Sequence, residues 1–263
     1  MGVFIPLLWA AANEKKTTLQ LLINKGADLE ARNPDTSYTA LMYAAVYGRV
    51  SATKYLLDSG AMLEVRDKYT YTPLALAASV GHEPITSLLL EKGADIEARA
   101  SDGSTPLSIA ARKGNDGVVK VLLEKGANVE AENQAGDSSL LRACNYGHMG
   151  VIQQLIDAGA NIHTQTYDGS TPLSAAARKG REGLVKLLLE KGADIDTRDH
   201  SGDTPLSRAC LYDHMGVVRM LLDKGAIVDV RNKQGKTTLQ LAEKNAKAEI
   251  VSLLRKHLAT KER

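Results

Sequence analysis

The sequence predicts an all-α fold made of tandem helix–turn–helix units, and three observations support this. A Gly-Ala pair recurs at intervals of 34 and then 33 residues. A Thr-Pro-Leu-like triplet recurs in phase with it, and each interval holds two short apolar stripes with helical spacing. With one Phe and one Trp in 263 residues, the composition suits a core of many small helix pairs. The glycines of the pair are Gly26, Gly60, Gly93, Gly126, Gly159, Gly192 and Gly225.

The triplet marks the start of the first helix of each unit. Its hydroxyl residues are typical helix N-caps, and proline fits the first helical position. Ile5-Pro6-Leu7 lies 34 residues before Thr39 and adds an incomplete first unit. The triplets begin at Thr39, Thr72, Thr105, Ser138, Thr171, Thr204 and Thr237. We expect one domain, residues 1–263, with eight units called repeats 1 to 8: 1–31 (N-terminal cap), 32–65, 66–98, 99–131, 132–164, 165–197, 198–230 and 231–263 (C-terminal cap).

Repeat 4 shows how one unit is built. Asp102-Gly103 is a turn signal, Thr105 caps the first helix, and Gly114 ends it. A second helix follows and stops at Gly126, which supplies a left-handed residue. The first apolar stripe holds Leu107, Ala110 and Ala111, and the second holds Val118, Val119, Leu122 and Leu123.

One such helix pair cannot bury its apolar face alone, but stacked copies bury a continuous core. Alanine pairs such as Ala44-Ala45 and Ala110-Ala111 on the first helix allow neighbouring repeats to approach closely. Their small volume predicts that the first-helix side of the array is concave.

These residues resemble the ankyrin repeat, whose pattern of about 33 residues carries T-P-L-H-x-A-A in the first helix and a G-A-D tail. The match extends over essentially the whole chain, although the His of that motif is absent throughout. The resemblance implies a slightly curved solenoid with β-hairpin-like loops, called fingers, along one edge. It also implies that the first helices line a concave face, and that the chain binds a partner protein.

Both ends of the chain depart from the pattern. Phe4, Ile5, Leu8 and Trp9 are bulky and apolar, with no finger before them. They form either a self-packed cap or a face that another segment or the remainder of a longer protein covers. Arg255 stands where earlier repeats have Leu or Ile, which predicts a polar C-terminal cap.

Charge and cysteine content limit the function classes. The 33 basic and 31 acidic residues give a formal charge of +2, so we expect neither nucleic acid nor a membrane surface as partner. Val3–Ala12 lacks a basic flank for a signal peptide and is too short to span a membrane. Cys144 and Cys210 lie two repeats apart and should be free thiols. We therefore expect a cytoplasmic monomer, with the nucleus as the alternative compartment.

No catalytic motif is present in the sequence. It holds no P-loop, dinucleotide fingerprint, zinc-protease motif or nucleophile elbow. His82, His148 and His214 share one repeat position and are too far apart to hold one ion. Glu64 and Glu97 recur on one edge at the repeat spacing, which predicts a solvated face and not a catalytic acid–base pair. We expect no enzyme, no cofactor, no metal and no small-molecule substrate.

A first candidate binding surface lies in repeats 2 and 3. The finger glycine of repeats 4 to 8 is replaced there by Ser37 and Thr70. Tyrosine is a favoured interface residue, so these irregular fingers predict a binding surface. The alternative is that the tyrosines only stiffen the turns. The tyrosines of this surface are Tyr38, Tyr43, Tyr47, Tyr69 and Tyr71.

A second candidate surface is a stripe of cationic and aromatic residues on the first helices of repeats 4 to 7. Such a stripe would grip an acidic or extended peptide segment. The alternative is a solvated basic edge that finger aspartates balance. The stripe holds Arg112, Lys113, Arg142, Tyr146, Arg178, Lys179, Arg208 and Tyr212.

The sequence therefore predicts a protein-interaction scaffold or adaptor. An alternative is the targeting or regulatory segment of a larger multidomain enzyme, with its chemistry outside these residues. Binding of nucleic acid or anionic lipid along the stripe is a third hypothesis, which the near-zero net charge opposes.

Overall fold

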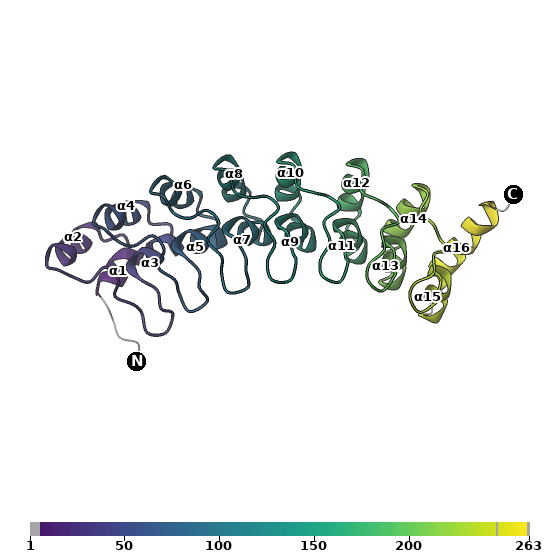
Figure 1. The fold of residues 1–263 in the computed structure, drawn as a ribbon, viewed down its shortest axis with the longest axis horizontal. Coiled ribbons are helices and arrows are strands. Elements are labelled where there is room, and N and C mark those ends of the chain that lie inside the picture. The colour runs from purple at the N-terminus through teal and green to yellow at the C-terminus, as the bar shows by residue number, and fades with distance from the viewer. Residues whose placement is uncertain (1–5, 246, 262–263) are drawn as a thin grey trace. The chain divides into compact units, whose positions relative to one another are not determined.

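Every regular element of the chain that the structure describes is an α-helix. The structure is a computed structural model that describes residues 6–245 and 247–261. Two compact parts divide the chain, residues 1–134 and 135–263, called the N-terminal part and the C-terminal part. In each part the odd-numbered helices form one row and the even-numbered helices form a second (Figure 1). Each part is described by itself.

The N-terminal part holds four helix pairs. Within each pair the first helix packs against the second, and α1, α3, α5 and α7 also pack one against the next. The helices are α1 (Pro6–Ala12), α2 (Lys16–Asn24), α3 (Ala40–Val46), α4 (Val50–Asp58), α5 (Pro73–Val80), α6 (Glu83–Glu91), α7 (Pro106–Lys113) and α8 (Asp116–Glu124).

The C-terminal part repeats this arrangement. Helices α9, α11, α13 and α15 pack in sequence, and each contacts the helix that follows it in the chain. The helices are α9 (Ser139–Tyr146), α10 (Met149–Asp157), α11 (Pro172–Arg178), α12 (Glu182–Glu190), α13 (Pro205–Leu211), α14 (Met215–Asp223), α15 (Thr238–Lys244) and α16 (Ala248–Lys261).

The predicted helix signals are confirmed at atomic level. Each triplet residue from Thr39 to Thr237 is an N-cap whose side-chain oxygen accepts a backbone N–H three residues later. Gly26 to Gly225 of the Gly-Ala pairs all have positive φ. An added Cβ at Gly126 would meet nothing within 4 Å, so backbone conformation alone requires the glycine there. Asp213 takes the same left-handed conformation, with φ of 66°.

The core is made of small and aliphatic side chains, as the composition predicts. The alanine pairs Ala44-Ala45 and Ala110-Ala111 are completely buried between neighbouring odd-numbered helices. Leu7 and Leu8 of the first helix are also buried, whereas Trp9 is 44% exposed. Phe4 and Ile5 lie outside the described residues. At the other end, Arg255 is exposed and donates to Glu243 at 2.7 Å, as suits a polar cap.

Side chains before each finger link one repeat to the next. Glu64 Oε1 accepts the backbone N–H of Asp95 at 2.9 Å, and Glu97 Oε1 accepts that of Asn128 at 2.7 Å. These glutamates therefore connect repeats and do more than face solvent. Three arginines make a parallel ladder in which Nη1 donates to a carbonyl of the following repeat: Arg32 to Arg66, Arg66 to Arg99, and Arg99 to Glu132.

The fingers are hairpin-like turns closed by a few backbone hydrogen bonds. The backbone N–H of Asp67 donates to Tyr71 at 3.1 Å, and that of Asp199 donates to Asp203 at 3.1 Å. Within the described residues the one β-type pairing is an isolated antiparallel bridge between Arg231 and Thr237. The expectation of a single eight-unit domain stays a prediction.

Candidate functional site

The predicted tyrosines of repeats 2 and 3 lie together. The ring of Tyr43 meets Tyr38 edge-on with centroids 5.5 Å apart, and it stacks on Tyr47 at 6.3 Å. Tyr38 and Tyr71 pack against a small apolar cluster of Met42, Val65 and Leu76. Tyr47 and Tyr69 are 52% and 56% exposed, so these two rings offer the most surface to a partner.

Asp67 organises the second of these fingers. Its Oδ1 accepts the backbone N–H groups of Tyr69 and Tyr71, each at 2.8 Å. The residue is buried, and its Oδ2 has no hydrogen-bond partner within the described residues. Partial burial, and then the charge of Asp67, raise the pKa of the nearby Tyr38 hydroxyl.

The two irregular fingers hold backbone strain. Ser37 and Thr70, which replace the finger glycine, have φ of 61° and 63°. Side chains other than glycine rarely adopt this left-handed region, and a β-branched residue such as Thr70 is an outlier there. Ser37 and Thr70 therefore adopt the same left-handed backbone conformation that glycine has in the other fingers.

The stripe residues of the C-terminal part fall into two groups. Arg178 ends helix α11, and the exposed Lys179 caps it. Tyr146 and Tyr212 are 58% and 53% exposed. Each stacks on a histidine, Tyr146 on His148 and Tyr212 on His214. Three of these four stripe residues are exposed, and Arg178 is half-buried.

The other two arginines of the C-terminal stripe are less accessible, Arg142 being buried and Arg208 half-buried. Arg142 is only 6% exposed. Arg208 Nε donates to Asp199 Oδ2 at 2.9 Å, and its Nη2 lies 3.6 Å from Asp203 Oδ2. Burial lowers the pKa of Arg208, but the hydrogen bond and charge of Asp199 more than offset this and raise it. The sequence places these two arginines at a repeat position that is otherwise mostly apolar, such as Leu76 and Ile109, whereas Arg178 lies at the end of its helix.

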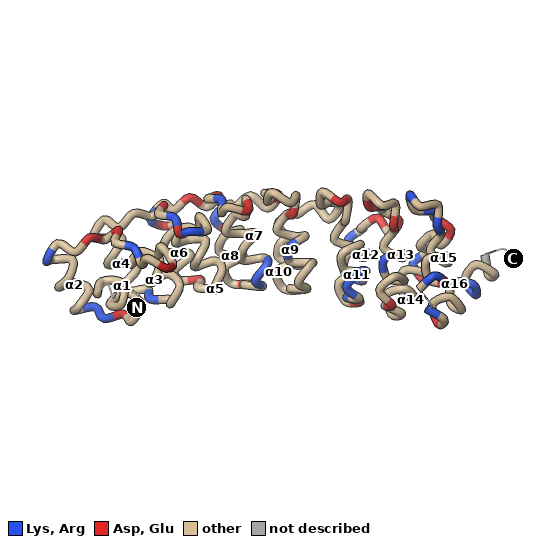
Figure 2. Tube along the Cα trace, turned by 90° about the horizontal axis from the view of Figure 1, so that it is seen from below, with Lys and Arg blue, Asp and Glu red and all other residues tan. Residues whose placement is uncertain are grey.

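Arg112 and Lys113 belong to the N-terminal part. They form the last turn of α7, with Arg112 half-buried and Lys113 exposed. Continuation of the stripe from repeat 4 into repeat 5 stays a prediction. Basic and acidic residues are interspersed along both parts of the chain (Figure 2), as the balanced composition indicates.

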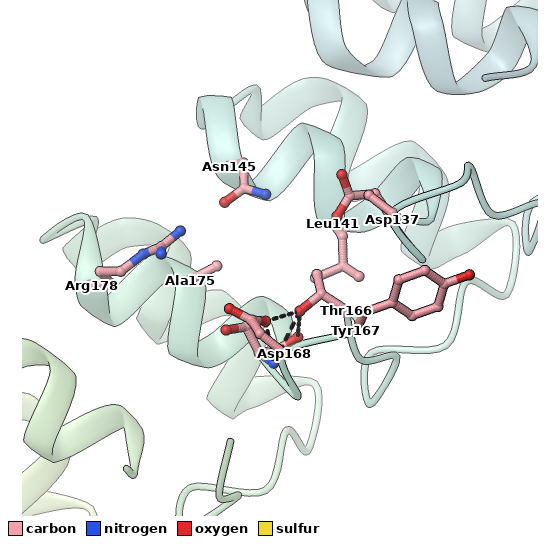
Figure 3. A pocket seen from close by; sticks show the side chains of 10 residues that line it. Asp137, Leu141, Asn145, Thr166, Tyr167, Asp168, Ala175 and Arg178 are labelled. Carbon is pink, nitrogen blue, oxygen red and sulfur yellow. Dashed lines mark hydrogen bonds between the residues drawn. The ribbon is translucent and has the colours of Figure 1, made fainter. Parts of the chain in front are cut away.

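A pocket opens between repeats 5 and 6 on the row of odd-numbered helices. Its volume is about 350 Å³, and it lies between α9, α11 and the fingers that precede them. Figure 3 shows Asn145, Arg178 and Ala175 on the left of this hollow, Asp168 below it and Leu141 on its right. The sequence singled out Arg178 but not this pocket.

Asp168 is held firmly at the pocket's edge. Thr166 Oγ1 and the backbone N–H of Ser170 donate to Asp168 Oδ1, the latter at 3.1 Å. The hydrogen bond from Thr166 is the main reason that the pKa of this carboxyl is low, and Arg178 lowers it further. Asp168 is therefore ionised at neutral pH.

The repeated histidines have a structural role. His82 Nε2 lies 2.9 Å from the carbonyl oxygen of Val46, and His214 Nε2 lies 2.9 Å from that of Arg178. Each connects the start of an even-numbered helix to the end of the odd-numbered helix one repeat earlier. Within the described ranges no group of three metal-ligating side chains is arranged to hold an ion.

The two cysteines are free and buried in the odd-numbered helices of repeats 5 and 7, at Cys144 and Cys210. Burial raises the pKa of both thiols to about 12. Such thiols are neutral at physiological pH and are poor nucleophiles.

Comparison with known protein families shows which family the chain belongs to. The family model described as ankyrin repeats in three copies matches residues 7–100, 62–133, 107–199 and 196–262. The chain belongs to the ankyrin repeat family. Ankyrin repeat domains generally mediate protein–protein interaction, and their homologues are typically non-enzymatic.

Solved structures agree with this assignment. The ankyrin repeat domain of human ASB11 is 33% identical, with a TM-score of 0.72, over 78% of this chain and 92% of that one. The ankyrin repeat domain of Bcl-3, a member of the IkappaB family, is 26% identical, with a TM-score of 0.73, over 84% of this chain and all of that one.

Curated relatives match this ankyrin repeat protein over a shorter stretch. Ankyrin repeat and SAM domain-containing protein 6 of Mus musculus and that of Rattus norvegicus are each 38% identical over 63 residues. The stretch is 24% of this chain and 7% of each relative's length. Within the described residues, no helix has both the length and the apolar character to cross a bilayer.

Proposed function

We propose that this ankyrin repeat domain binds an extended, acidic segment of a partner protein along its odd-numbered helices and the adjoining fingers. The observation that carries the proposal is the state of Arg178 and Lys179. Neither side chain has a hydrogen bond or ion pair to another described residue, and exposed tyrosines lie in the same part of the chain. Arginine and tyrosine side chains are enriched at interface hot spots.

The charges of the helices in this part support an acidic partner. Helices α9, α11 and α13 carry Arg142, Arg178 and Arg208 and no Asp or Glu. The acidic residues lie in the fingers, where Asp199 and Asp203 are committed to Arg208. An acidic segment that lies on the helices would therefore gain the attraction of Arg178 and Lys179.

The tyrosine surface of repeats 2 and 3 supports a second contact region. Tyr47 and Tyr69 are the exposed rings, so they are the residues to test. Tyr38 and Tyr71 pack against the interior, and their replacement would change folding together with binding. The free, buried thiols support a reducing compartment such as the cytoplasm.

Charge reversal tests the acidic-segment proposal. We expect Arg178→Glu with Lys179→Glu to abolish the capture of partners that the wild-type domain retains from a cell lysate. The matched control is Lys54→Glu with Lys120→Glu, which changes the net charge equally on exposed positions of even-numbered helices. Equal capture by both double variants would refute the proposal. Nucleic acid in the captured material, lost on nuclease treatment, would also refute it.

The length of the curated relatives favours a second candidate function. Their names combine ankyrin repeats with a SAM domain, and the match covers 7% of their length. The repeats would then act as the targeting segment of a longer protein. Sequencing of the full transcript tests this, because an open reading frame limited to these repeats would exclude it.

A further inference from the structure

One position on the odd-numbered helices of the C-terminal part interrupts a row of large side chains. Arg142, Ala175 and Arg208 occupy equivalent positions, 33 residues apart, in repeats 5, 6 and 7. Ile109 and Leu76 occupy the same position in repeats 4 and 3. Ala175 is thus the one small side chain among these five positions. The pocket of about 350 Å³ lies over it and is called here the Ala175 pocket.

The floor of the Ala175 pocket is apolar. Leu141 from α9 and Ala175 from α11 line it, and both are almost completely buried by the repeats around them. A guest side chain could therefore cover this floor with methylene groups. Leu141 is 0% and Ala175 3% exposed, so such packing would add contacts between side chains and remove little apolar surface from water.

The pocket holds two hydrogen-bond donors that no acceptor of the described residues occupies. The guanidinium of Arg178 and the side-chain amide of Asn145 have no hydrogen-bond partner among the described residues. Asp168 Oδ1 already accepts from Thr166 and Ser170, and Asp137 is engaged within the chain. Figure 3 shows Arg178 and Asn145 on the same side of the hollow. The pocket thus offers a guanidinium and an amide to an acceptor, although Asp168, whose pKa Arg178 lowers, balances part of the positive charge.

We propose that the Ala175 pocket is an anchor site for a glutamate side chain of the partner segment. The glutamate carboxylate accepts from the Arg178 guanidinium and the Asn145 amide, while its methylenes cover Leu141 and Ala175. This inference rests on the proposed function, because it names the residue of the acidic segment that the domain holds. An arginine–carboxylate pair fits this geometry because the planar guanidinium can donate two parallel hydrogen bonds.

The neighbouring repeats supply the variants that test the anchor. Ala175→Ile introduces the residue found at this position in repeat 4, and Ala175→Arg the residue found in repeats 5 and 7. Both place a larger side chain in the pocket, but only the second adds a positive charge. A purely electrostatic stripe would bind acidic ligands more tightly after Ala175→Arg, whereas a filled anchor pocket would bind them more weakly. Arg178→Gln removes the proposed donor without filling the pocket.

The probe is N-acetyl-glutamate N-methylamide, titrated into the whole chain and followed by NMR. We expect saturable shifts of the Asn145 side-chain amide and the Arg178 Nε–H signals in the wild-type protein. Each variant should weaken this binding at least tenfold, and the equivalent glutamine and lysine compounds should bind at least tenfold more weakly than the glutamate compound. Circular dichroism of each variant checks that it folds, and Arg178→Gln leaves the packed interior unchanged.

Three outcomes would overturn the anchor: no saturable shift, equal binding to Ala175→Ile, or preference for the lysine compound. These outcomes differ from a failure of the proposed function. If lysate capture is lost on reversal of Arg178 and Lys179 but persists in Ala175→Ile, the acidic-segment proposal stands and the anchor is refuted. If capture survives the reversal while the glutamate compound still saturates the pocket, the pocket binds carboxylates but is not the partner site.

Discussion

Arg208 Nε donates to Asp199 Oδ2 at 2.9 Å, so an arginine on helix α13 is bound by the finger that precedes that helix. The Asp199 side chain is only 2% exposed and that of Arg208 is 22% exposed. Asp199 Oδ1 also accepts the backbone N–H groups of Ser201 and Asp203. The pair therefore fixes the finger of repeat 7 to its own helix.

We expect Asp199→Asn to lower the free energy of unfolding by about 1–3 kcal/mol, because it leaves a half-buried guanidinium with a weaker partner. Urea denaturation measures this. Asp229→Asn, at an exposed position in the same part of the chain, should change stability by less than about 0.5 kcal/mol. The double variant Asp199→Asn with Arg208→Leu should lose less than the sum of the single variants. Strict additivity would mean that the pair is not coupled.

Thr70→Gly should stabilise the protein by up to about 1 kcal/mol, because it relieves a left-handed conformation that costs threonine roughly 1–2 kcal/mol. The threonine hydroxyl is also buried without a hydrogen-bond partner within the described residues. The reverse substitution, Gly103→Thr in the next finger, should destabilise, since an added Cβ would lie 3.0 Å from the backbone nitrogen of Gln134. A lower urea midpoint for Thr70→Gly would contradict the strain argument.

Neither cysteine should react with a thiol reagent at pH 8 in the folded protein. Burial of Cys144 and Cys210 excludes the reagent and raises the pKa of both thiols to about 12, so almost no thiolate is present. Both should react at once in concentrated urea. Mass spectrometry after timed labelling separates the two sites, and rapid labelling of the native protein would show that the odd-numbered helices open easily.

The low pKa of Asp168 makes a small contribution to stability that depends on pH. A carboxyl whose pKa is lower in the folded state than in the unfolded state stabilises the folded protein at pH values above the unfolded-state pKa of about 3.9. This stabilisation is lost as the pH falls through the pKa of the folded state. Thr166→Val removes the hydrogen bond that is its main cause. We expect the Asp168 titration, followed by carboxyl NMR shifts, to move toward the ordinary range. Ser170 still donates its backbone N–H, so the return should be incomplete.

The repeat architecture could be predicted from the sequence because its signals are local. A hydroxyl at Thr105 caps the helix that begins at the next residue, and Gly126 ends the second helix through its own backbone conformation. Both effects act within one turn and recur in phase, so each copy supports the others. The left-handed conformation of Ser37 and Thr70 could not be inferred in this way, because the sequence shows only that the finger glycine is replaced there.

The details of the candidate site could not be predicted in this way. Arg142 and Arg208 share one repeat position, which is otherwise mostly apolar, yet Arg142 is buried and Arg208 is ion-paired, while Arg178, at the end of its helix, faces a pocket. Their states depend on which finger residue reaches each helix. The Ala175 pocket depends on a small side chain between two large ones. The sequence does hold one sign of this pocket, because Ala175 is small where the aligned positions of the neighbouring repeats hold larger residues.

The ladder of Arg32, Arg66 and Arg99 joins each repeat only to the following one, and this has a mechanical consequence. A chain pulled from its ends would release its outermost layer first, since each layer is held chiefly by a single neighbour. Each 33-residue repeat would add roughly 110 Å of contour length as it extends. Under force the repeats would then unfold one after another, and each could refold when the force is released.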